Sequence, residues 1–185
     1  MGIDFKVHSA ETAPAASRPV LEKTSSRYGM IPNLFGVLAE SPAAVEAYAS
    51  LSRLFGRSGL TPLEQHVVLQ THNIDNGCDY CAAAHSTVAR GAGVEPDIDD
   101  ALRNDEPLAD ARLEALRQFT KALDRERGWV GDEAVAGFIA AGFTQGNVLD
   151  VILGISFKRL SNYSNHVAAT PLDAPFAAHA WQKTG

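Results

Sequence analysis

Apolar side chains recur every three or four residues along most of this chain, which is the spacing of one buried face of an α-helix. The pattern is clearest in three segments: Val45 to Phe55, Leu108 to Arg127 and Val148 to Leu160. No segment alternates convincingly with the two-residue period of a β-strand. We therefore expect an all-α fold with about seven to nine helices, because the periodicity fits no other regular structure.

Capping signals divide the chain into the expected elements. Thr61 precedes Pro62 and stands three residues before Glu64, which is the pattern of a capping box, and Thr144 can cap the last long helix. Further helices are expected over residues 12–27, 33–40, 42–55, 61–75, 78–90 and 132–141, with weaker patterns over 97–103 and 173–181. Residues 1–11 lack such signals and are expected to form a loose N-terminal arm.

Length and composition favour one soluble domain. The chain has 185 residues, 45% of them hydrophobic, and no linker rich in Gly or Ser divides residues 1–185. A net charge of -6 without any basic run argues against a dedicated nucleic-acid binder. The N-terminus lacks the apolar core of a signal peptide, and the apolar stretch Val148 to Phe157 is too short to cross a membrane. We expect a cytoplasmic protein with no nucleic-acid or membrane partner.

Both cysteines of the chain lie in one short segment, Asn76 to His85 (NGCDYCAAAH). A helix that begins near Cys78 places Cys81 and His85 one turn apart on the same face. Cys78 then lies in the first turn, near unpaired N–H groups and the positive end of the helix dipole, which favour a thiolate over a thiol. The spacing predicts a redox-active pair of thiols with a neighbouring base.

Two other uses of these cysteines fit the sequence. A structural zinc site needs four ligands, and Cys78, Cys81 and His85 would supply three of them. The fourth would be another histidine of the chain, without the usual spacing of a second ligand pair. Alternatively, both thiols would pack in the core as small apolar groups. We favour the redox interpretation over both, with no bound metal.

The run from Leu60 to His85 (LTPLEQHVVLQTHNIDNGCDYCAAAH) resembles the signature of the alkylhydroperoxidase D-like (AhpD-like) branch of the carboxymuconolactone decarboxylase superfamily. Flanking segments are similar as well: MIPNL at 30–34, NYSNH at 162–166 and PLD at 171–173. The resemblance implies a single helical domain of the AhpD-like type that assembles as a trimer or hexamer. It also implies reduction of peroxides or disulfides by the cysteine pair, which decarboxylases of the superfamily generally lack.

The chemistry of the residues agrees with these implied roles. Cys81 is the better candidate for the attacking thiolate, and its attack on a peroxide oxygen would give a sulfenic acid. Cys78 would condense with that acid to a disulfide, which an external dithiol would reduce by exchange. His85 would accept the thiol proton, since imidazole titrates near neutrality. The expected substrate is a hydroperoxide or a disulfide, in an antioxidant reaction that needs no metal or organic cofactor.

One position departs from the family pattern. The family usually has a glutamate twelve residues before the first cysteine, where it completes a proton relay, and this chain has His66 there. Glu64 is no simple replacement, because two helix positions rotate a side chain by about 200°. His66 can itself donate and accept a proton. Asp75 is a second candidate acid, although its place beside Asn76-Gly77 favours a role in the turn.

The roles of two further residues, Asn162 and His166, have two interpretations, and one alternative function also fits the sequence. Asn162 and His166 share a helix face, so they would line the cavity of the thiols or satisfy a buried interface, and the second role is favoured. A cofactor-free lyase or isomerase of the carboxymuconolactone decarboxylase type would instead use a pocket of His66 and His85. In that case the cysteines would be bystanders.

Overall fold

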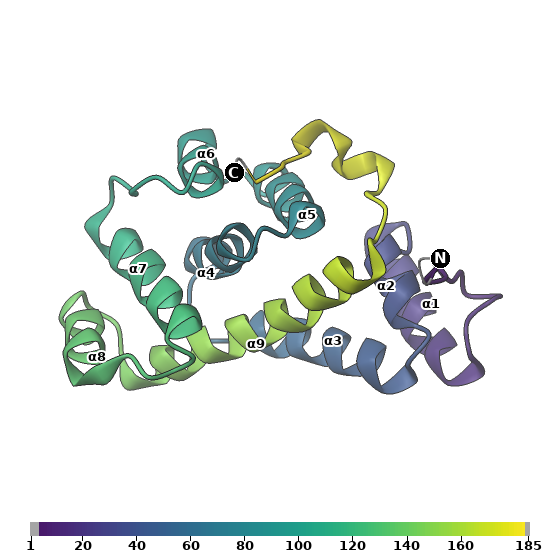
Figure 1. Cartoon of the computed structure of the whole chain (residues 1–185), viewed down its shortest axis with the longest axis horizontal. Coiled ribbons are helices and arrows are strands. Elements are labelled where there is room, and N and C mark those ends of the chain that lie inside the picture. The colour runs from purple at the N-terminus through teal and green to yellow at the C-terminus, as the bar shows by residue number, and fades with distance from the viewer. Residues whose placement is uncertain (1–3, 184–185) are drawn as a thin grey trace.

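The structure is a computed structural model that describes residues 4–183. Over this range the chain forms nine α-helices and two short 3-10 helices without any β-strand, which confirms the all-α prediction (Figure 1). The elements are η1 (Ala15–Ser17), α1 (Arg18–Tyr28), α2 (Asn33–Leu38), α3 (Pro42–Phe55), α4 (Pro62–Asp75), α5 (Asp79–Gly91), α6 (Pro96–Arg103), α7 (Ala111–Arg125), α8 (Gly131–Ala140), α9 (Gln145–Ala168) and η2 (Ala174–His179).

The capping residues start the helices where the sequence predicts them to start. Thr61 and Glu64 form the complete capping box of α4, and Thr144 forms an equivalent box with Asn147 at the start of α9. Such a cap stabilises a helix by about 1 kcal/mol, since it satisfies backbone N–H groups that have no partner within the helix. Asp110 caps α7 in the same way, so α7 begins at Ala111 rather than at Leu108.

α4 lies at the centre of the fold. It contacts α5, α6, α7 and α9, which surround it in Figure 1. A helix covered on all sides buries polar as well as apolar residues, and α4 buries His66, Gln70, His72 and Asn73. Buried polar groups need hydrogen-bond partners, and the partners of these residues come from the neighbouring helices.

α9 packs against α3 and α4 through a close contact at Gly154. A Cβ atom at this position would lie 2.7 Å from Cε2 of Phe55 and 2.8 Å from Cγ1 of Val68. These distances are shorter than carbon atoms tolerate, so glycine is required for the two helices to approach this closely. The second half of α9, from Lys158 onward, is thereby brought over the first turn of α5.

Both ends of the helical region differ from the prediction. Residues 12–17 form a turn and the 3-10 helix η1, so α1 begins at Arg18 rather than near Thr12. The terminal segment forms the 3-10 helix η2 instead of an α-helix. Pro175 has no N–H to donate, and a six-residue segment gains little from the longer α-helical hydrogen bonds.

The N-terminal arm is tied to the domain at His8. This side chain is buried, its Nε2 lies 2.6 Å from Oε2 of Glu40, and its backbone N–H donates to the carbonyl of Gly36 (3.1 Å). The arm was expected to be loose, but its second half is held against the domain. Residues 1–3 of the arm lie outside the described residues.

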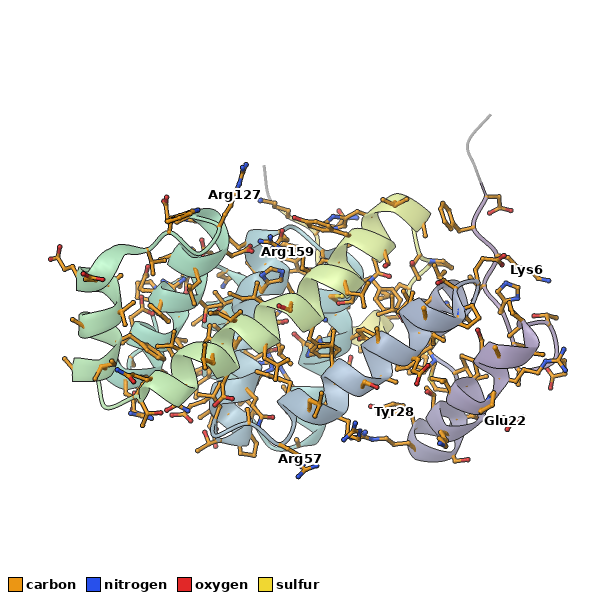
Figure 2. The ribbon with its side chains drawn as sticks, turned by 90° about the horizontal axis from the view of Figure 1, so that it is seen from below. Lys6, Glu22, Tyr28, Arg57, Arg127 and Arg159 are labelled. Atoms are coloured by element: carbon orange, nitrogen blue, oxygen red, sulfur yellow. The ribbon has the colours of Figure 1, made fainter. Side chains whose placement is uncertain are left out.

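Charged side chains cover the outer surface, and Figure 2 shows Lys6, Glu22 and Arg57 extending away from the helices. Within residues 4–183, no single helix has both the length and the apolar character needed to cross a bilayer.

Candidate active site

A sharp turn between α4 and α5 presents both cysteines. Gly77 adopts a left-handed conformation with φ of 66°, which residues with a Cβ avoid. The backbone N–H of Cys78 then donates to the carbonyl of Asn73 (2.9 Å), Cys78 takes the N-cap position, and Cys81 lies in the first turn of α5. Both thiols are free, and they are 0% and 1% exposed. The predicted helix start is confirmed.

Tyr80, between the two cysteines, joins three of the four segments that carry the family resemblance. Its hydroxyl donates to Oδ2 of Asp173 (2.5 Å) and accepts from the backbone N–H of Leu34 (3.2 Å). Asn33 adds two bonds, from its backbone N–H to the Asp173 carboxylate and from its side-chain amide to the carbonyl of Pro171 (2.9 Å). The segments at 30–34 and 171–173 therefore hold the first turn of α5 in place.

α9 supplies polar groups to the thiols. The Asn165 side-chain amide lies with Nδ2 3.2 Å from Sγ of Cys81 and 3.8 Å from Sγ of Cys78. The Cys81 sulfur also lies 3.6 Å from Oγ of Ser161. Because one amide group reaches both sulfurs, the two cysteines form a single site.

His85 contacts a buried lysine. Nζ of Lys158 donates to Nε2 of His85 (2.9 Å), and Lys158 is 0% exposed. An ammonium group cannot accept a hydrogen bond, so Nε2 of His85 must be unprotonated. Burial lowers the pKa of His85 well below its usual value, and the neighbouring Lys158 and His66 lower that pKa further. The low pKa and the contact with Lys158 therefore both favour the neutral form of His85.

The two thiols differ in protonation. Burial acts to raise the pKa of Cys81, but the hydrogen bond from Cys78, the positive charge of Lys158 and the Ser161 hydroxyl outweigh it and hold this pKa well below its usual value. The pKa of Cys78 is raised by its hydrogen bond to Cys81, by burial and by the negative charge of Cys81. These opposite shifts favour Cys81 over Cys78 as the thiolate. The position of Cys78 at the start of the helix was expected to favour a thiolate there, but the neighbouring Cys81 and burial raise its pKa instead.

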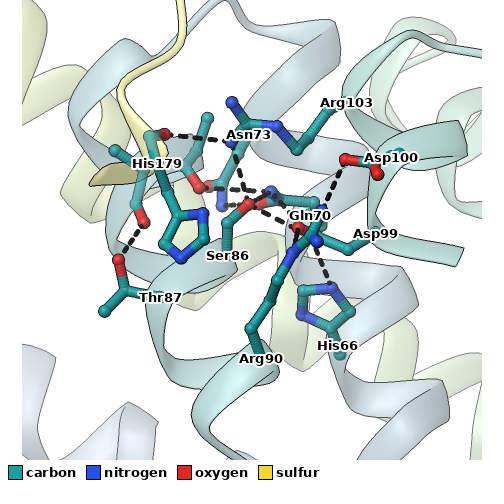
Figure 3. Close-up of polar contacts among 12 residues, drawn as sticks. His66, Gln70, Asn73, Ser86, Thr87, Arg90, Asp99, Asp100, Arg103 and His179 are labelled. Atoms are coloured by element: carbon teal, nitrogen blue, oxygen red, sulfur yellow. Dashed lines mark hydrogen bonds and ion pairs between the residues drawn. The ribbon is translucent and has the colours of Figure 1, made fainter. Parts of the chain in front are cut away.

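His66 belongs to a second polar cluster, shown in Figure 3. Its Nε2 lies 3.1 Å from Oδ1 of Asp99, which is 0% exposed and comes from α6. Asp99 also accepts from Oγ of Ser86 (3.1 Å) and from Nε of Arg90 (3.1 Å). Burial acts to raise the pKa of Asp99, but the contacts with His66, Ser86 and Arg90 lower it below the usual aspartate value. The histidine at the family's glutamate position is therefore paired with an ionised carboxylate.

Buried amides connect this cluster with the thiols. Gln70 donates to Oγ of Ser86 (2.9 Å), and its own Oε1 accepts from the side chain of Asn73 (3.1 Å). Asn73 Oδ1 accepts in turn from Nδ2 of Asn162 on α9 (3.1 Å). This chain of hydrogen bonds fixes α4, α5 and α9 relative to one another, which confines the groups around the sulfurs to one arrangement.

Some of the predicted residues do not reach the thiols. The carboxylate of Asp75 is bound by the guanidinium of Arg125, with Oδ2 3.0 Å from Nε, and Glu64 is bound by Arg112 (3.0 Å). His166 is exposed at the end of α9. Asn162 is buried in the amide network, as the favoured interpretation of this residue expects.

Sequence reasoning missed Lys158, Ser161, Asn165 and Asp99. The first three share one face of α9 with Asn162, at the i, i+3, i+4 and i+7 positions of a helix otherwise buried by apolar residues. A polar stripe at this spacing inside an apolar helix was the available signal. Asp99 shares a buried face with Leu102, and an acidic residue on the apolar side of a short helix was the equivalent signal.

The donor set does not suit zinc. Among residues 4–183, no group of three or more His, Cys, Asp and Glu side chains is placed to hold one metal ion. His85, the proposed third ligand, has its unprotonated nitrogen occupied by the Lys158 ammonium. A cation beside the thiols would also repel a metal ion.

Comparisons with known proteins give a family match for the central part of the chain. Residues 39–122 match the Carboxymuconolactone decarboxylase family, and this segment contains Cys78, Cys81, His85 and His66. A comparison with curated proteins finds no significant match.

Solved structures share the fold over nearly the whole chain. One is a peroxidase-related protein from Ralstonia eutropha JMP134 with an alkylhydroperoxidase AhpD core. It is 21% identical to this chain, the match covers 92% of each of the two chains, and the TM-score is 0.82. A peroxidase-related protein from Silicibacter sp. TM1040 is 20% identical over 95% of each chain, with a TM-score of 0.78. The debrominase Bmp8, in complex with 2,3,4-tribromopyrrole, is 16% identical over 97% of this chain and 96% of its own, with a TM-score of 0.78.

These comparisons establish an all-helical, AhpD-like fold. The match of residues 39–122 to the family and the shared AhpD-like fold agree with the resemblance seen in the sequence.

Proposed function

We propose that this protein is a thiol-dependent peroxidase or disulfide reductase. The observation that carries the proposal is the pair of free thiols at the start of α5, where the Asn165 amide lies 3.2 Å from the Cys81 sulfur and 3.8 Å from the Cys78 sulfur. The lowered pKa of Cys81 and the raised pKa of Cys78 favour a thiolate at Cys81. The thiolate is the nucleophilic form of cysteine, and a second thiol next to it can convert the oxidised product into a disulfide. The peroxidase-related proteins that share the fold support an enzyme of this general class.

The first step is attack of the Cys81 sulfur on the terminal oxygen of a hydroperoxide. The O–O bond breaks, Cys81 becomes a sulfenic acid, and the departing oxygen takes a proton and leaves as an alcohol or as water. Cys81 loses two electrons and the hydroperoxide gains them. Asn165 and Ser161 hold the sulfur in position for this attack.

The second step joins the two cysteines. The sulfur of Cys78 bonds to that of Cys81, and the sulfenic hydroxyl leaves as water with the proton of Cys78. An external dithiol then reduces the disulfide by exchange and is itself oxidised to a disulfide. The cytoplasm keeps such dithiols reduced and is the proposed location. With a disulfide as substrate, Cys81 attacks a substrate sulfur first and Cys78 resolves the mixed disulfide.

Proton transfer between the site and solvent is assigned to His85, which is half-buried and neutral. We assign the role of the missing family glutamate to His66 together with Asp99. The carboxylate of this relay then belongs to Asp99 on α6 instead of a glutamate on α4, and the imidazole ring of His66 connects it to the site. An imidazole has two ring nitrogens, so His66 beside the Asp99 carboxylate can pass a proton from one side of the ring to the other, as a relay requires.

Thiol counting tests the proposal. Addition of one equivalent of hydroperoxide to the reduced protein should remove both free thiols together, since the sulfenic acid is converted to a disulfide within the same site. Free thiols are counted with a chromogenic disulfide reagent after denaturation, and the intramolecular disulfide is confirmed by mass spectrometry. Loss of one thiol, or of none, would contradict the proposal.

Two controls separate the rival functions. The debrominase shares this fold, so 2,3,4-tribromopyrrole is included as a comparison oxidant in the same thiol count. A variant with both cysteines replaced by serine should lack all redox activity. A lyase or isomerase activity that persists in this variant would assign the chemistry to His66 and His85 instead, and stoichiometric zinc in protein purified without chelator would assign the thiols to a structural metal site.

We also propose that the chain forms a homo-oligomer, a trimer or hexamer. Leu149 and Ile152 lie on α9 and are 67% and 42% exposed, and the nearby Trp129 is 89% exposed. Ile152 borders a surface cavity of about 230 Å³ together with Leu123 and other residues. Exposed apolar groups of this size favour burial against another chain. Mass photometry at micromolar concentration should give three or six times 19.7 kDa, and a monomer would contradict the proposal.

A further inference from the structure

Lys158 carries a buried charge without an acidic partner. Its side chain is 0% exposed, and within residues 4–183 no carboxylate lies within 4 Å of its ammonium group. Lys121, the other buried lysine described, shows the usual solution, because its ammonium contacts both carboxylate oxygens of Asp105 (2.5 Å and 2.7 Å). A buried ammonium that lacks such a partner is costly unless another anion offsets its charge.

The groups around Lys158 leave one candidate for that anion. The titratable side chains in this part of the structure are Cys78, Cys81 and His85 from α5, Tyr48 from α3 and His66 from α4. Neither histidine carries a negative charge in any protonation state, and Cys78 keeps its proton. Burial and the negative charge of Cys81 raise the pKa of Tyr48 well above its usual value, so Tyr48 also stays neutral.

The α7 carboxylate that pairs with the residue next to Lys158 is already engaged. Asp124 pairs with Arg159, the next residue on α9, and lies 3.3 Å from Nδ1 of His72. Lys158 and Arg159 therefore point to different partners from adjacent positions of one helix. The sulfur of Cys81 remains as the anion available to Lys158.

We propose that Lys158 is the counter-ion of the Cys81 thiolate and the acid that protonates the oxygen leaving the hydroperoxide. The counter-ion role rests on the complete burial of Lys158 and the absence of a carboxylate within 4 Å of its ammonium group among residues 4–183, with the raised pKa values of Cys78 and Tyr48 in support. The acid role rests in addition on the proposed function. Lys158 would thus be a catalytic residue that the sequence pattern did not reveal, in a site whose cysteines and His85 it did reveal.

The proton balance links the charge of Lys158 to the oxidation state of the thiols. Before reaction the site holds a thiolate, a thiol and an ammonium group. Attack on the hydroperoxide converts the thiolate to a sulfenic acid, and the ammonium proton passes to the leaving oxygen, which departs as an alcohol or water. Condensation with Cys78 releases one water, so the site ends with a neutral disulfide and a neutral amine. No unpaired buried charge is left in either state.

Reduction reverses the charge state. An external dithiol carries two protons, of which one goes to the Cys78 thiol and the other to the Lys158 amine, while Cys81 leaves as the thiolate. His85 is bonded to Lys158 and half-buried, so it provides a path by which the amine exchanges its proton with solvent.

Removal of the charge tests the counter-ion role. Lys158→Met keeps a long unbranched side chain without the ammonium group, and the midpoint of thiolate formation is followed by ultraviolet absorbance of the reduced protein against pH. The midpoint should rise by about one pH unit or more, which means roughly ten-fold less thiolate below both midpoints. Lys121→Met is the matched control and should leave the midpoint unchanged. An unchanged midpoint in Lys158→Met would overturn the proposal.

A second variant separates the charge from the proton. Lys158→Arg keeps the positive charge, but a guanidinium group does not release its proton near neutral pH. The thiolate midpoint should therefore stay low while peroxide turnover falls by about ten-fold or more. Turnover at the wild-type rate would overturn the acid role. If the larger arginine prevents folding, Lys158→Ala with added ethylammonium replaces it, and restored turnover is expected while absence of rescue would overturn the acid role.

The counter-ion role and the acid role of Lys158 are tested by different measurements. The midpoint measurement uses no oxidant, so it decides the counter-ion role whatever the substrate is. A wild-type protein that reduces no hydroperoxide would overturn the proposed function and the acid role together, with the midpoint shift still present.

Discussion

Cys81→Ser should abolish hydroperoxide reduction, lowering turnover by about 10³-fold or more, the scale seen when a nucleophile is removed from a catalytic unit. The serine hydroxyl is a weak nucleophile near neutral pH, and neither Lys158 nor Asn165 can compensate for the lost thiolate. Peroxide consumption in the presence of an excess dithiol measures the effect. The environment of Cys81 makes this the most sensitive position of the site, since three neighbouring groups stabilise its negative charge.

Cys78→Ser is the matched control, because it removes a sulfur atom from the same site without removing the thiolate. The first peroxide equivalent should still react, within about ten-fold of the wild-type rate, since the serine hydroxyl can replace the hydrogen bond to Cys81. The product should be a sulfenic acid that dimedone traps. If Cys78→Ser loses this first reaction and Cys81→Ser retains it, the roles of the two cysteines are reversed.

Asp99→Asn should be the most destabilising change of a single charge in the domain, at about 2–4 kcal/mol. The carboxylate is 0% exposed and accepts from His66, Ser86 and Arg90, so the amide would leave donors without an acceptor. For a chain of this size the melting temperature should fall by roughly 5–15 °C. Thermal denaturation followed by circular dichroism measures it.

The difference in melting temperature between wild type and Asp99→Asn should become smaller as the pH is lowered. Because the pKa of Asp99 in the folded state lies below its usual 3.8, its stabilising effect is complete above about pH 4 and is lost as the pH falls further. The two melting temperatures should therefore converge in acid. Asp100→Asn is the control: Asp100 also pairs with Arg90 but is 56% exposed, so its loss should cost less than about 1 kcal/mol. Equal effects of the two substitutions would contradict the role of Asp99.

Helix positions were predictable from the sequence to within a few residues wherever a local signal defines the boundary. Thr61 and Thr144 cap α4 and α9 as expected, because a capping box depends on four consecutive residues alone. The prediction was wrong for the start of the first helix at Thr12 and for the terminal helix that ends at Trp181. Apolar periodicity does not distinguish a short 3-10 helix from an α-helix.

The chemistry of the site was predictable only in part. The spacing of Cys78, Cys81 and His85 follows from one helix, so sequence reasoning found all three. The sequence favours Cys81 as the attacking thiolate because it lies one turn from His85. The groups that lower the pKa of Cys81 are others: the hydrogen bond from Cys78, the charge of Lys158 and the Ser161 hydroxyl.

The sequence by itself therefore determined the all-helical class, the family resemblance of the central segment and the dithiol at the start of a helix, because these depend on periodicity and spacing within short segments. The tertiary structure alone decided what surrounds the sulfurs. Lys158 lies 73 residues from His85 and Asp99 lies 33 residues from His66 in the chain. These contacts exist because α9 crosses closely at Gly154 and α6 packs on α4, and no local pattern specifies packing between segments so far apart.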